Sequence, residues 1–504
     1  MPQLRQNSIF PRTIIKKQYF IHLIVLLFVL LGVINLKNSG LIDWDEGVFA
    51  LQGQWIATLG AEGKPFNFQT PPLFQIFIAI LFKLVGPHDI VLPLLSLVFS
   101  GLTLYFVFYL AKRLFSTEEA IYATLIFMST EFFLFFSTSG LSDAAFLFFF
   151  TTSIFFFIKS VEKNRMRDFL LTIFFTTLAL YTKYSAITLP IIFIILGKQL
   201  KKRWFLSSII IPIIMFSPYI YLFLKFVQIP EIGVRHVSFL GLNHMKYLLY
   251  LIIFAPIPLI LSLIYLVVSF KRLEQWDLSI VIIILVFFVM LGFYYPFFRL
   301  TYPLIPLLSI LAARIIIQTN RYKIYFLAFS ILISLALGTQ TIFYKRDVPR
   351  NVAMYVNHFV QEKDIKVIYT VVPPNIYFYI NGSIAVPSNH PWFTIGKKFP
   401  VLLKKKKIIY PDENELSVQA KIILIHATAI DSIKQDNSIL YNKGTLVQSI
   451  EFIDAPVYYK DIYNLQRDIK QIYEIYEFDI KTIGEHIDDL WKFGFDRHVE
   501  VIFR

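Results

Sequence analysis

Three acidic residues stand within four positions of one short stretch, LIDWDEGVFALQGQWIATLG at residues 41–60. Asp43, Asp45 and Glu46 follow an apolar run, and apolar residues recur behind them at the spacing of an amphipathic helix. Carboxylates this close repel one another, which makes one of them a better general base. The pattern therefore indicates a catalytic acid cluster. The alternative is that Asp45 only caps an interfacial helix.

Four more charged residues fall near the ends of long apolar runs. Glu131 lies within one run, and a carboxylate inside a membrane suggests a function, although a hydrogen-bonded or snorkelling Glu is the alternative. Asp143 opens another run, where an N-cap is the alternative role. Lys183 and Arg299 either anchor to lipid headgroups or hold a phosphate opposite the acids.

The composition places these residues in a polytopic membrane protein. Of the 504 residues, 56% are hydrophobic and 16% are charged, and the mean hydropathy is +0.62. There is no cysteine, which excludes a disulfide framework, haem attachment and a thiolate metal site. The net charge of +14 comes with basic loops between apolar runs, so it signals topology and not nucleic-acid binding.

Basic residues set the expected orientation. Four of them precede a first anchor at 19–36 that lacks a signal-peptide cleavage site, so the N-terminus is expected to be cytoplasmic. If residues 71–86 form an interfacial or re-entrant helix, every later basic cluster falls inside; as a full span they would send those clusters outside. We adopt the interfacial interpretation. It gives about eleven spans at 19–36, 89–111, 119–137, 141–159, 168–182, 184–200, 204–226, 246–270, 277–295, 298–318 and 322–343.

The chain changes character after residue 343. Short β-branched and aromatic segments appear, KVIYTVV, SIAVPS, KKIIY and KIILIHA, separated by Pro, Asn and Gly. The sequence thus predicts an all-α membrane domain over 1–343 and a small soluble α/β domain over 344–504, outside the membrane. The four lysines at 404–407 are expected to form a solvated edge.

Nucleotide and zinc-protease motifs are absent from the sequence. There is no P-loop and no HExxH, which leaves helicase, ATPase and zincin functions without support. His236 and His244 stand eight apart and are weak evidence for a metal. No cofactor is certain on this basis, and a divalent metal stays possible.

Several of these stretches resemble one family. The first external loop, DWDEGVFALQGQWIATLG followed by TPPLFQIFIAILFKLVG, is similar to that of the GT-C membrane glycosyltransferases that include protein O-mannosyltransferases and lipid A aminoarabinose transferases. LSDAAFLFF, LALYTKYSAITLP and FFRLTYPLIPLLSILAARI match further motifs in the same order. The likeness runs from about residue 18 to 320.

The resemblance implies the site residues. Asp45 matches the family's catalytic aspartate, with Glu46 beside it as a second catalytic candidate, and Asp143 matches a second acidic position in the same cavity. Lys183 and Arg299 fall where cations would hold a lipid phosphate. With them, Asp43, Glu131 and Tyr302 complete the expected substrate-binding set.

One departure from the family stands at residues 69–70. This chain has Gln-Thr there, where the aminoarabinose transferases carry an acidic residue and a lysine. A metal or phosphate contact at that point is therefore not expected from the resemblance alone.

The function implied is transfer of a hexose or pentose, with inversion, from a polyprenyl-phosphate carrier in the bilayer to an extracytoplasmic protein, lipid or glycan. Such a reaction needs a carboxylate to deprotonate the acceptor and cations to hold the departing phosphate. One alternative is an oligosaccharide transferase or ligase with a diphosphate-linked donor. Another, from a different class, is a transporter or lipid flippase. Transporters tend to have two related halves with helices broken by Gly or Pro at corresponding positions, and the sequence shows no such pairing.

Overall fold

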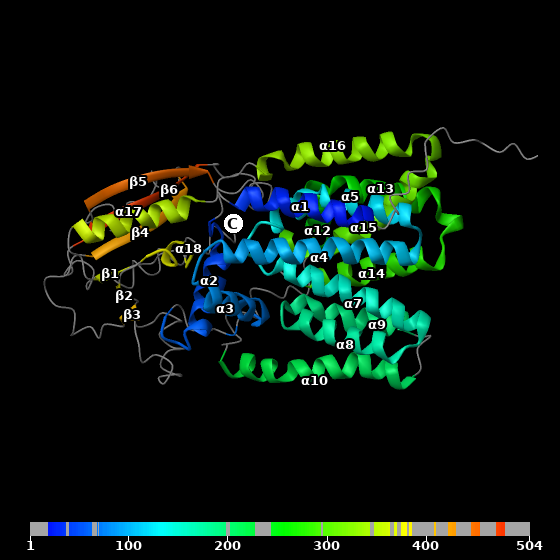
Figure 1. Cartoon of the computed structure of the whole chain (residues 1–504), viewed down its shortest axis with the longest axis horizontal. Coiled ribbons are helices and arrows are strands. Elements are labelled where there is room, and N and C mark those ends of the chain that lie inside the picture. The colour runs from blue at the N-terminus through cyan, green and yellow to red at the C-terminus, as the bar shows by residue number, and fades with distance from the viewer. Residues whose placement is uncertain are drawn as a thin grey trace, which may run out of the picture.

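Helices make up most of the described chain, and in Figure 1 the long ones run side by side with strands beyond one end of the bundle. The computed structural model describes residues 19–36, 40–62, 68, 70–197, 202–226, 243–293, 296–342, 347–362, 367–369, 374–380, 383–385, 408–409, 422–429, 445–453 and 470–478.

Each of the eleven expected spans has a helical counterpart. The bundle helices are α1 (Phe20–Asn35), α4 (Val91–Leu114), α5 (Thr117–Met128), α6 (Glu131–Phe136), α7 (Asp143–Lys163), α8 (Met166–Leu180), α9 (Thr188–Leu196), α10 (Lys202–Phe226), α12 (Asn243–Phe254), α13 (Pro256–Val268), α14 (Gln275–Leu291), α15 (Leu304–Gln318) and α16 (Lys323–Ile342). Short 3-10 turns η3 (Tyr184–Ile187), η5 (Phe270–Arg272), η6 (Phe298–Thr301) and η7 (Asn320–Tyr322) join some of them.

Two of the expected spans are broken, which corrects the prediction of single helices at 119–137 and 246–270. The first is interrupted after α5, and Thr130 caps α6 by accepting from the Phe133 N–H at 3.4 Å. The second bends by 110° between α12 and α13. Pro256 opens α13, where it has no N–H to donate and its ring excludes continuation of the preceding helix.

By length and composition, four described helices can cross a membrane, or five if the bent pair counts as one span. Five shorter apolar helices accompany them, among them α1 and α15. The expected polytopic membrane protein is confirmed at this level, while the number eleven stays a prediction.

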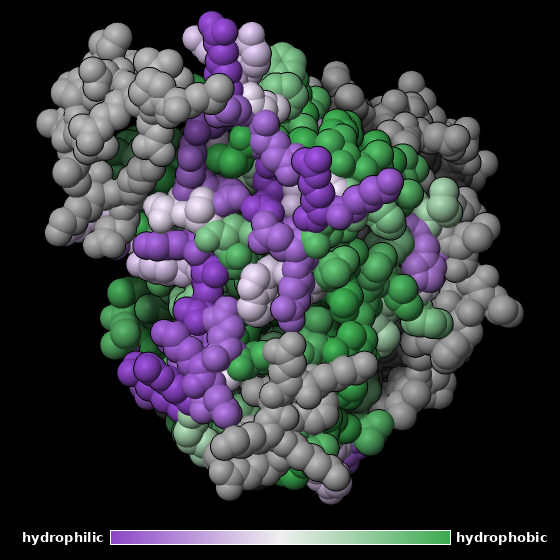
Figure 2. Space-filling model, turned by 90° about the vertical axis from the view of Figure 1, so that its right-hand side faces the viewer, coloured by the Kyte–Doolittle hydropathy of each residue, from purple (hydrophilic) through white to green (hydrophobic). Residues whose placement is uncertain are grey.

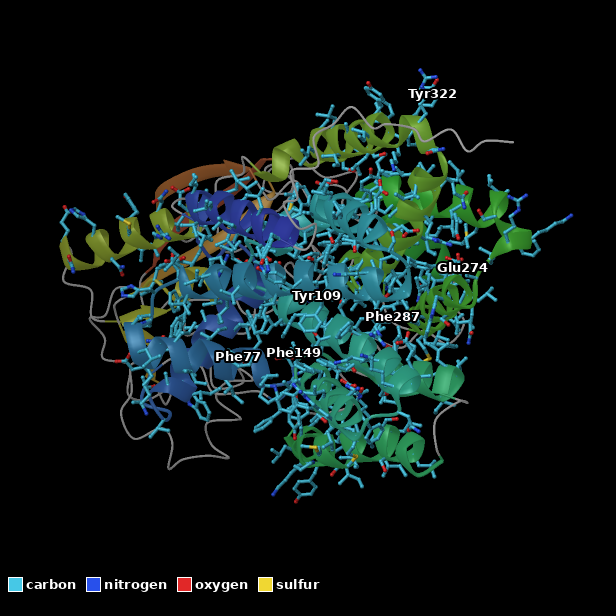
Figure 3. The ribbon with its side chains drawn as sticks, turned by 45° about the vertical axis from the view of Figure 1, so that its right-hand side comes forward. Phe77, Tyr109, Phe149, Glu274, Phe287 and Tyr322 are labelled. Carbon is cyan, nitrogen blue, oxygen red and sulfur yellow. The ribbon has the colours of Figure 1, made fainter. Side chains whose placement is uncertain are left out.

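Two shorter helices, α2 (Trp44–Ala57) and α3 (Leu73–Val85), lie at the bundle end nearest the strands (Figure 1). The 13 residues of α3 span only about 20 Å, less than the hydrocarbon core of a bilayer. Phe77 of α3 stacks on Phe149 of α7 at 6.4 Å between ring centroids, and the two lie together in Figure 3. Such a helix, seated on the end of the bundle, agrees with the interfacial interpretation of residues 71–86.

The described residues of the C-terminal part form helices α17 (Val348–Glu362) and α18 (Pro374–Tyr377) and six strands. β1 (Val367–Tyr369), β2 (Ser383–Ala385) and β3 (Ile408–Ile409) pair in parallel, in that order. β6 (Lys470–Phe478) pairs antiparallel with β4 (Ile422–Ala429) and β5 (Thr445–Ile453). The four segments expected as strands coincide with β1 to β4. Lys404–Lys407 lie outside the described residues.

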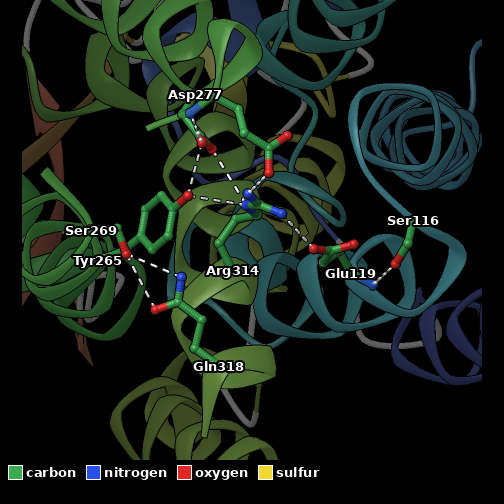
Figure 4. Close-up of polar contacts among 8 residues, drawn as sticks. Ser116, Glu119, Tyr265, Ser269, Asp277, Arg314 and Gln318 are labelled. Atoms are coloured by element: carbon green, nitrogen blue, oxygen red, sulfur yellow. Dashed lines mark hydrogen bonds and ion pairs between the residues drawn. The ribbon is translucent and has the colours of Figure 1, made fainter. Parts of the chain in front are cut away.

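The opposite end of the bundle is closed by ion pairs. Figure 2 faces this end and shows hydrophilic residues gathered in a band across it. At this end, the Arg314 guanidinium donates to Glu119 at 2.8 Å, to Glu274 at 2.6 Å and to the Tyr265 hydroxyl at 3.1 Å (Figure 4). Asp277 accepts from Tyr265 at 2.9 Å. These contacts join α5, α13, α14 and α15 where the helices begin or end.

Candidate active site at the strand-side end of the bundle

The acidic stretch at the start of α2 uses its three carboxylates differently. Asp43 is the N-cap and accepts from the Asp45 N–H at 2.6 Å, in extended backbone conformation. The cap is therefore Asp43 and not Asp45, which corrects that alternative. Because Asp43 supplies the cap, the Asp45 side chain is not needed as a cap. Asp45 lies in the first turn of α2, and its side chain is 30% exposed.

Glu46 is 1% exposed and holds backbone groups. Its Oε2 accepts from the Ile42 N–H at 2.7 Å and from the Asp43 N–H at 3.2 Å, which completes a capping box. Its Oε1 accepts from the Gly140 N–H at 2.6 Å. The side chain thus ties the start of α2 to the turn before α7, a geometry that supports positioning more than proton transfer.

Gly140 is a residue that the sequence patterns did not single out. A Cβ at this position would lie 2.8 Å from the Leu92 Cβ and 3.4 Å from the Glu46 Cγ, so the backbone approaches too closely for a side chain. The signal in the sequence was the Gly between α6 and the acidic start of α7, in the stretch STSGLSD.

Asp45 forms an ion pair with Arg299, which lies in η6. The Arg299 Nη2 donates to the Asp45 Oδ2 at 2.5 Å. Within the described residues, Arg299 uses one terminal nitrogen for this contact and packs its guanidinium over Phe297 at 5.7 Å. Further N–H donors of its planar fork therefore stay available for an anion.

A second ion pair joins Asp143 and Lys183. Asp143 is the first residue of α7 and is only 2% exposed, and Lys183 lies in the turn between α8 and η3. Asp143 does not serve as the N-cap of α7, since that position belongs to Ser142. Its Oδ1 binds Lys183, while its buried Oδ2 has no hydrogen-bond partner in the described part of the chain. An unsatisfied buried carboxylate oxygen is costly, and this one is free to accept a hydrogen bond from a further donor.

The two pairs are electrostatically one cluster. Burial alone would lower the pKa of Arg299, but the carboxylates of Asp45, Asp143 and Asp43 more than offset it, and the pKa is raised. Burial also lowers the pKa of Lys183, and Asp143 offsets this only in part while Arg299 adds to the lowering. Arg299 is thus a permanent cation, whereas the charge of Lys183 depends on its carboxylate partner and on pH.

Tyr302 lines the apolar side of this cluster. It is buried against Phe127, Phe132 and Phe136, with the last ring centroid 4.7 Å away. Its hydroxyl has no hydrogen-bond partner among the described residues. A second orphaned polar atom therefore accompanies the Asp143 Oδ2.

Glu131 takes a different place. It is buried as the first residue of α6, and a Cβ on Gly338 of α16 would lie 3.5 Å from its Cα. The segments with the paired charges are the start of α2, the start of α7, the turn before η3 and η6. Glu131 belongs to none of these, and its role in substrate binding stays a prediction.

The described residues do not support the two metal positions considered from the sequence, at His236 and His244 and at residues 69–70. Within the described ranges, no group of three or more His, Asp or Glu residues could hold an ion. His236 and Gln69 lie outside those ranges, and His244 instead contacts the Val289 carbonyl at 3.2 Å. Thr70 accepts from the Gln75 amide at 3.0 Å.

Comparisons with known proteins point to one fold. Residues 69–222 match the family model described as dolichyl-phosphate-mannose-protein mannosyltransferase. This range includes Asp143 and Lys183 of the cluster. The search of curated proteins found no significant match.

Solved structures extend the similarity over most of the chain. ArnT from Cupriavidus metallidurans in the apo state has a TM-score of 0.62 at 15% identity, covering 91% of this chain and 98% of that one. The same protein bound to undecaprenyl phosphate has a TM-score of 0.60 at 13% identity, with the same coverage. The apo oligosaccharyltransferase from Archaeoglobus fulgidus reaches 0.50 at 12% identity, covering 72% of this chain and 64% of that one. The chain therefore has the GT-C fold of membrane glycosyltransferases, as its motifs predicted.

Proposed function

We propose that this chain transfers a sugar from a polyprenyl-phosphate carrier to an extracytoplasmic acceptor, with inversion at the anomeric carbon. The observation that carries the proposal is the Asp45–Arg299 ion pair, which sets a candidate base beside a candidate phosphate ligand at one end of a membrane bundle. The GT-C fold and the ArnT structure bound to undecaprenyl phosphate support the same conclusion.

The reaction assigns a task to each charge. The acceptor oxygen attacks the anomeric carbon while the bond from that carbon to the phosphate oxygen breaks. Asp45 takes the proton of the acceptor hydroxyl, and the phosphate leaves with its bonding electron pair. Arg299 and Lys183 stabilise the charge that develops on the phosphate. Asp143 Oδ2 can accept from a hydroxyl group of the sugar, and the Tyr302 hydroxyl can donate to a sugar or phosphate oxygen.

The charge balance favours a monophosphate donor. The cluster holds three carboxylates, Asp43, Asp45 and Asp143, against the two cations Lys183 and Arg299. A sugar linked through one phosphate carries a single negative charge before transfer, and the carrier phosphate carries more afterwards. A diphosphate-linked donor brings more negative charge into a site that already has a net charge of minus one. This argument ranks the oligosaccharide-transferase alternative second.

The remaining features of the proposal rest on the sequence. We assign residues 1–343 to the transferase domain with about eleven spans and residues 344–504 to an extracytoplasmic α/β domain. The basic loops imply a cytoplasmic N-terminus. Arg299 pairs with the candidate base and Lys183 with Asp143, so two cationic side chains are present to bind the phosphate, and a divalent metal stays a possible addition. The sugar is a hexose or a pentose.

Reconstitution tests the proposal directly. Purified protein in liposomes is given undecaprenyl-phosphate-linked hexoses and pentoses, together with membranes of a host strain that lacks the chain. We expect labelled sugar to move onto membrane or surface material, and the matching nucleotide sugars to be ignored. Labelled substrate that crosses the liposome without transfer would instead indicate a flippase.

A further inference from the structure

Two backbone groups just ahead of α2 are bonded by side chains that lie more than 300 positions later in the chain. The Leu41 N–H donates to the Tyr379 hydroxyl at 3.0 Å, and the Asn375 Nδ2 donates to the Ile42 carbonyl at 2.9 Å. Asn375 belongs to α18, and Tyr379 follows in the turn after it. These contacts are not part of the charged cluster, and no motif in the sequence predicts them.

The Tyr379 hydroxyl group makes two hydrogen bonds, one as acceptor and one as donor. The hydroxyl oxygen accepts from the Leu41 N–H, and the O–H donates to the Asp89 Oδ2 at 2.6 Å. Asp89 lies between α3 and α4, so one phenol joins the segment before α2 to the segment after α3. Arg350 of α17 donates through Nε to the same Asp89 oxygen at 2.9 Å and packs over the Tyr379 ring at 5.8 Å.

Asn375 is as firmly placed. It is buried, and its Oδ1 accepts from the Ile376 N–H at 3.1 Å, which sets the amide so that its NH2 group faces Ile42. Asn357 of α17 donates to the Tyr379 carbonyl at 2.9 Å and fixes the turn that follows α18. Phe378 stacks on Phe82 of α3 at 5.9 Å. We call Asn375 and Tyr379, with their support from Arg350 and Asn357, the C-terminal clamp.

We propose that Asn375 and Tyr379 are positioning residues for sugar transfer: they hold the backbone at Leu41 and Ile42 and so set the direction in which Asp45 points. This inference rests on the proposed function. Asp45 lies three residues beyond Ile42, and the residues between are already fixed to α2 by the Asp43 cap and the Glu46 capping box. The clamp therefore supplies the remaining connection, between the start of α2 and the C-terminal part of the chain.

The clamp is expected to affect the rate through the position of the Asp45 carboxylate. A base must lie within hydrogen-bond reach of the acceptor hydroxyl, and an error of about 1 Å in a reacting group costs up to a hundredfold in rate. Loss of the Tyr379 hydroxyl leaves the Leu41 N–H without its partner, and the short segment ahead of α2 gains freedom. The charges of the cluster stay in the chain, so donor binding changes less than turnover.

The test compares Tyr379→Phe and Asn375→Ser in the full-length protein. Tyr325→Phe, on the exposed face of α16, is the matched control. We expect kcat to fall about ten- to a hundredfold in the two clamp variants. KM for an undecaprenyl-phosphate-linked sugar should change less than kcat, because the charged groups expected to bind the donor are unaltered. Amide hydrogen exchange in residues 40–46 should accelerate in Tyr379→Phe and not in the control.

The outcomes separate the two levels of the proposal. If the wild-type protein transfers sugar and both clamp variants keep its kcat, the positioning role fails and the proposed function stands. Faster exchange at residues 40–46 with wild-type kcat also overturns the positioning role, because the contact then exists without consequence for turnover. If the wild-type protein transfers no sugar from any polyprenyl-phosphate donor, the proposed function fails and the positioning role falls with it.

Discussion

Arg299 and Asp45 are 254 positions apart in the chain, and their side chains meet at 2.5 Å. The pair joins the first turn of α2 to the 3-10 turn η6 that precedes α15. Arg314, at the other end of the bundle, engages three carboxylates and a tyrosine. Arg299 by contrast engages one carboxylate in the described part of the chain. The fully engaged Arg314 is typical of a structural arginine, whereas Arg299 keeps N–H donors for a ligand.

Asp45→Asn should abolish most turnover. A general base contributes roughly a hundred- to ten-thousandfold to rate, and Asn cannot take the proton. Folding should be kept, because the cap of α2 is Asp43. Asp43→Asn is the matched control, since Asn caps a helix about as well as Asp, and we expect it to lose less activity than Asp45→Asn. Initial rates of sugar transfer measure both; similar rates for the two variants would remove Asp45 from the base role.

Arg299→Lys should weaken donor binding less than Arg299→Ala. An ammonium keeps the charge but loses the planar fork that engages two phosphate oxygens. Binding of undecaprenyl phosphate to the purified variants, followed by calorimetry, measures the order of affinities. If Arg299→Ala binds undecaprenyl phosphate as tightly as the wild type does, Arg299 serves only as the partner of Asp45.

Lys183 should give donor binding an alkaline limit. Its pKa is lowered by burial, so the ammonium loses its proton at a lower pH than a solvated lysine does. Affinity for undecaprenyl phosphate should therefore be greatest below that pKa and should fall as pH rises through it. Lys183→Arg should shift this fall to higher pH, because a guanidinium stays charged. Identical pH profiles for the two proteins would exclude Lys183 as a phosphate ligand.

Glu46→Gln should act on stability first. The amide group turns a donor toward at least one of the N–H groups that Glu46 now accepts from, and an unsatisfied buried donor costs about 1–3 kcal/mol. We expect a lower midpoint of thermal unfolding in detergent, with residual activity in the folded fraction. An unchanged midpoint combined with complete loss of turnover would return Glu46 to the catalytic residues.

Cysteine labelling of this Cys-free chain tests whether α3 lies at the membrane interface or crosses the membrane. Leu59→Cys and His88→Cys flank that helix at exposed positions, and Arg165→Cys lies in the loop between α7 and α8. Thiols at 59 and 88 should react with an impermeant reagent from outside, and the thiol at 165 only after permeabilisation. Opposite sides for 59 and 88 would mean that α3 crosses the membrane.

The sequence predicted the elements better than their interruptions. Long apolar runs reveal helices, but the break after α5 and the elbow at Pro256 depend on how neighbouring helices pack, and period alone does not show them. The ion pairs were within reach of sequence reasoning only as charges at helix ends. Which cation meets which acid is set by the fold, and here Lys183 meets Asp143 while Arg299 meets Asp45.

Capping patterns were ambiguous for a similar reason. Asp43, Asp45 and Glu46 each fit a helix start, and only the folded geometry distinguishes the cap Asp43, the box partner Glu46 and the ion-paired Asp45. The residues of the C-terminal clamp had no signal at all. Asn375 and Tyr379 are ordinary polar residues in their stretch, and their partners are main-chain atoms that leave no trace in side-chain identity.

The clamp has a consequence for chimeric proteins. A hybrid that joins this helical bundle to the C-terminal region of a relative would inherit every charged side chain of the site. It would still lack a matched donor for the Ile42 carbonyl and a matched acceptor for the Leu41 N–H unless the grafted region brings them. The proposed boundary near residue 343 is thus a poor place to exchange modules, because Asn375 and Tyr379 lie beyond it and their main-chain partners lie before it.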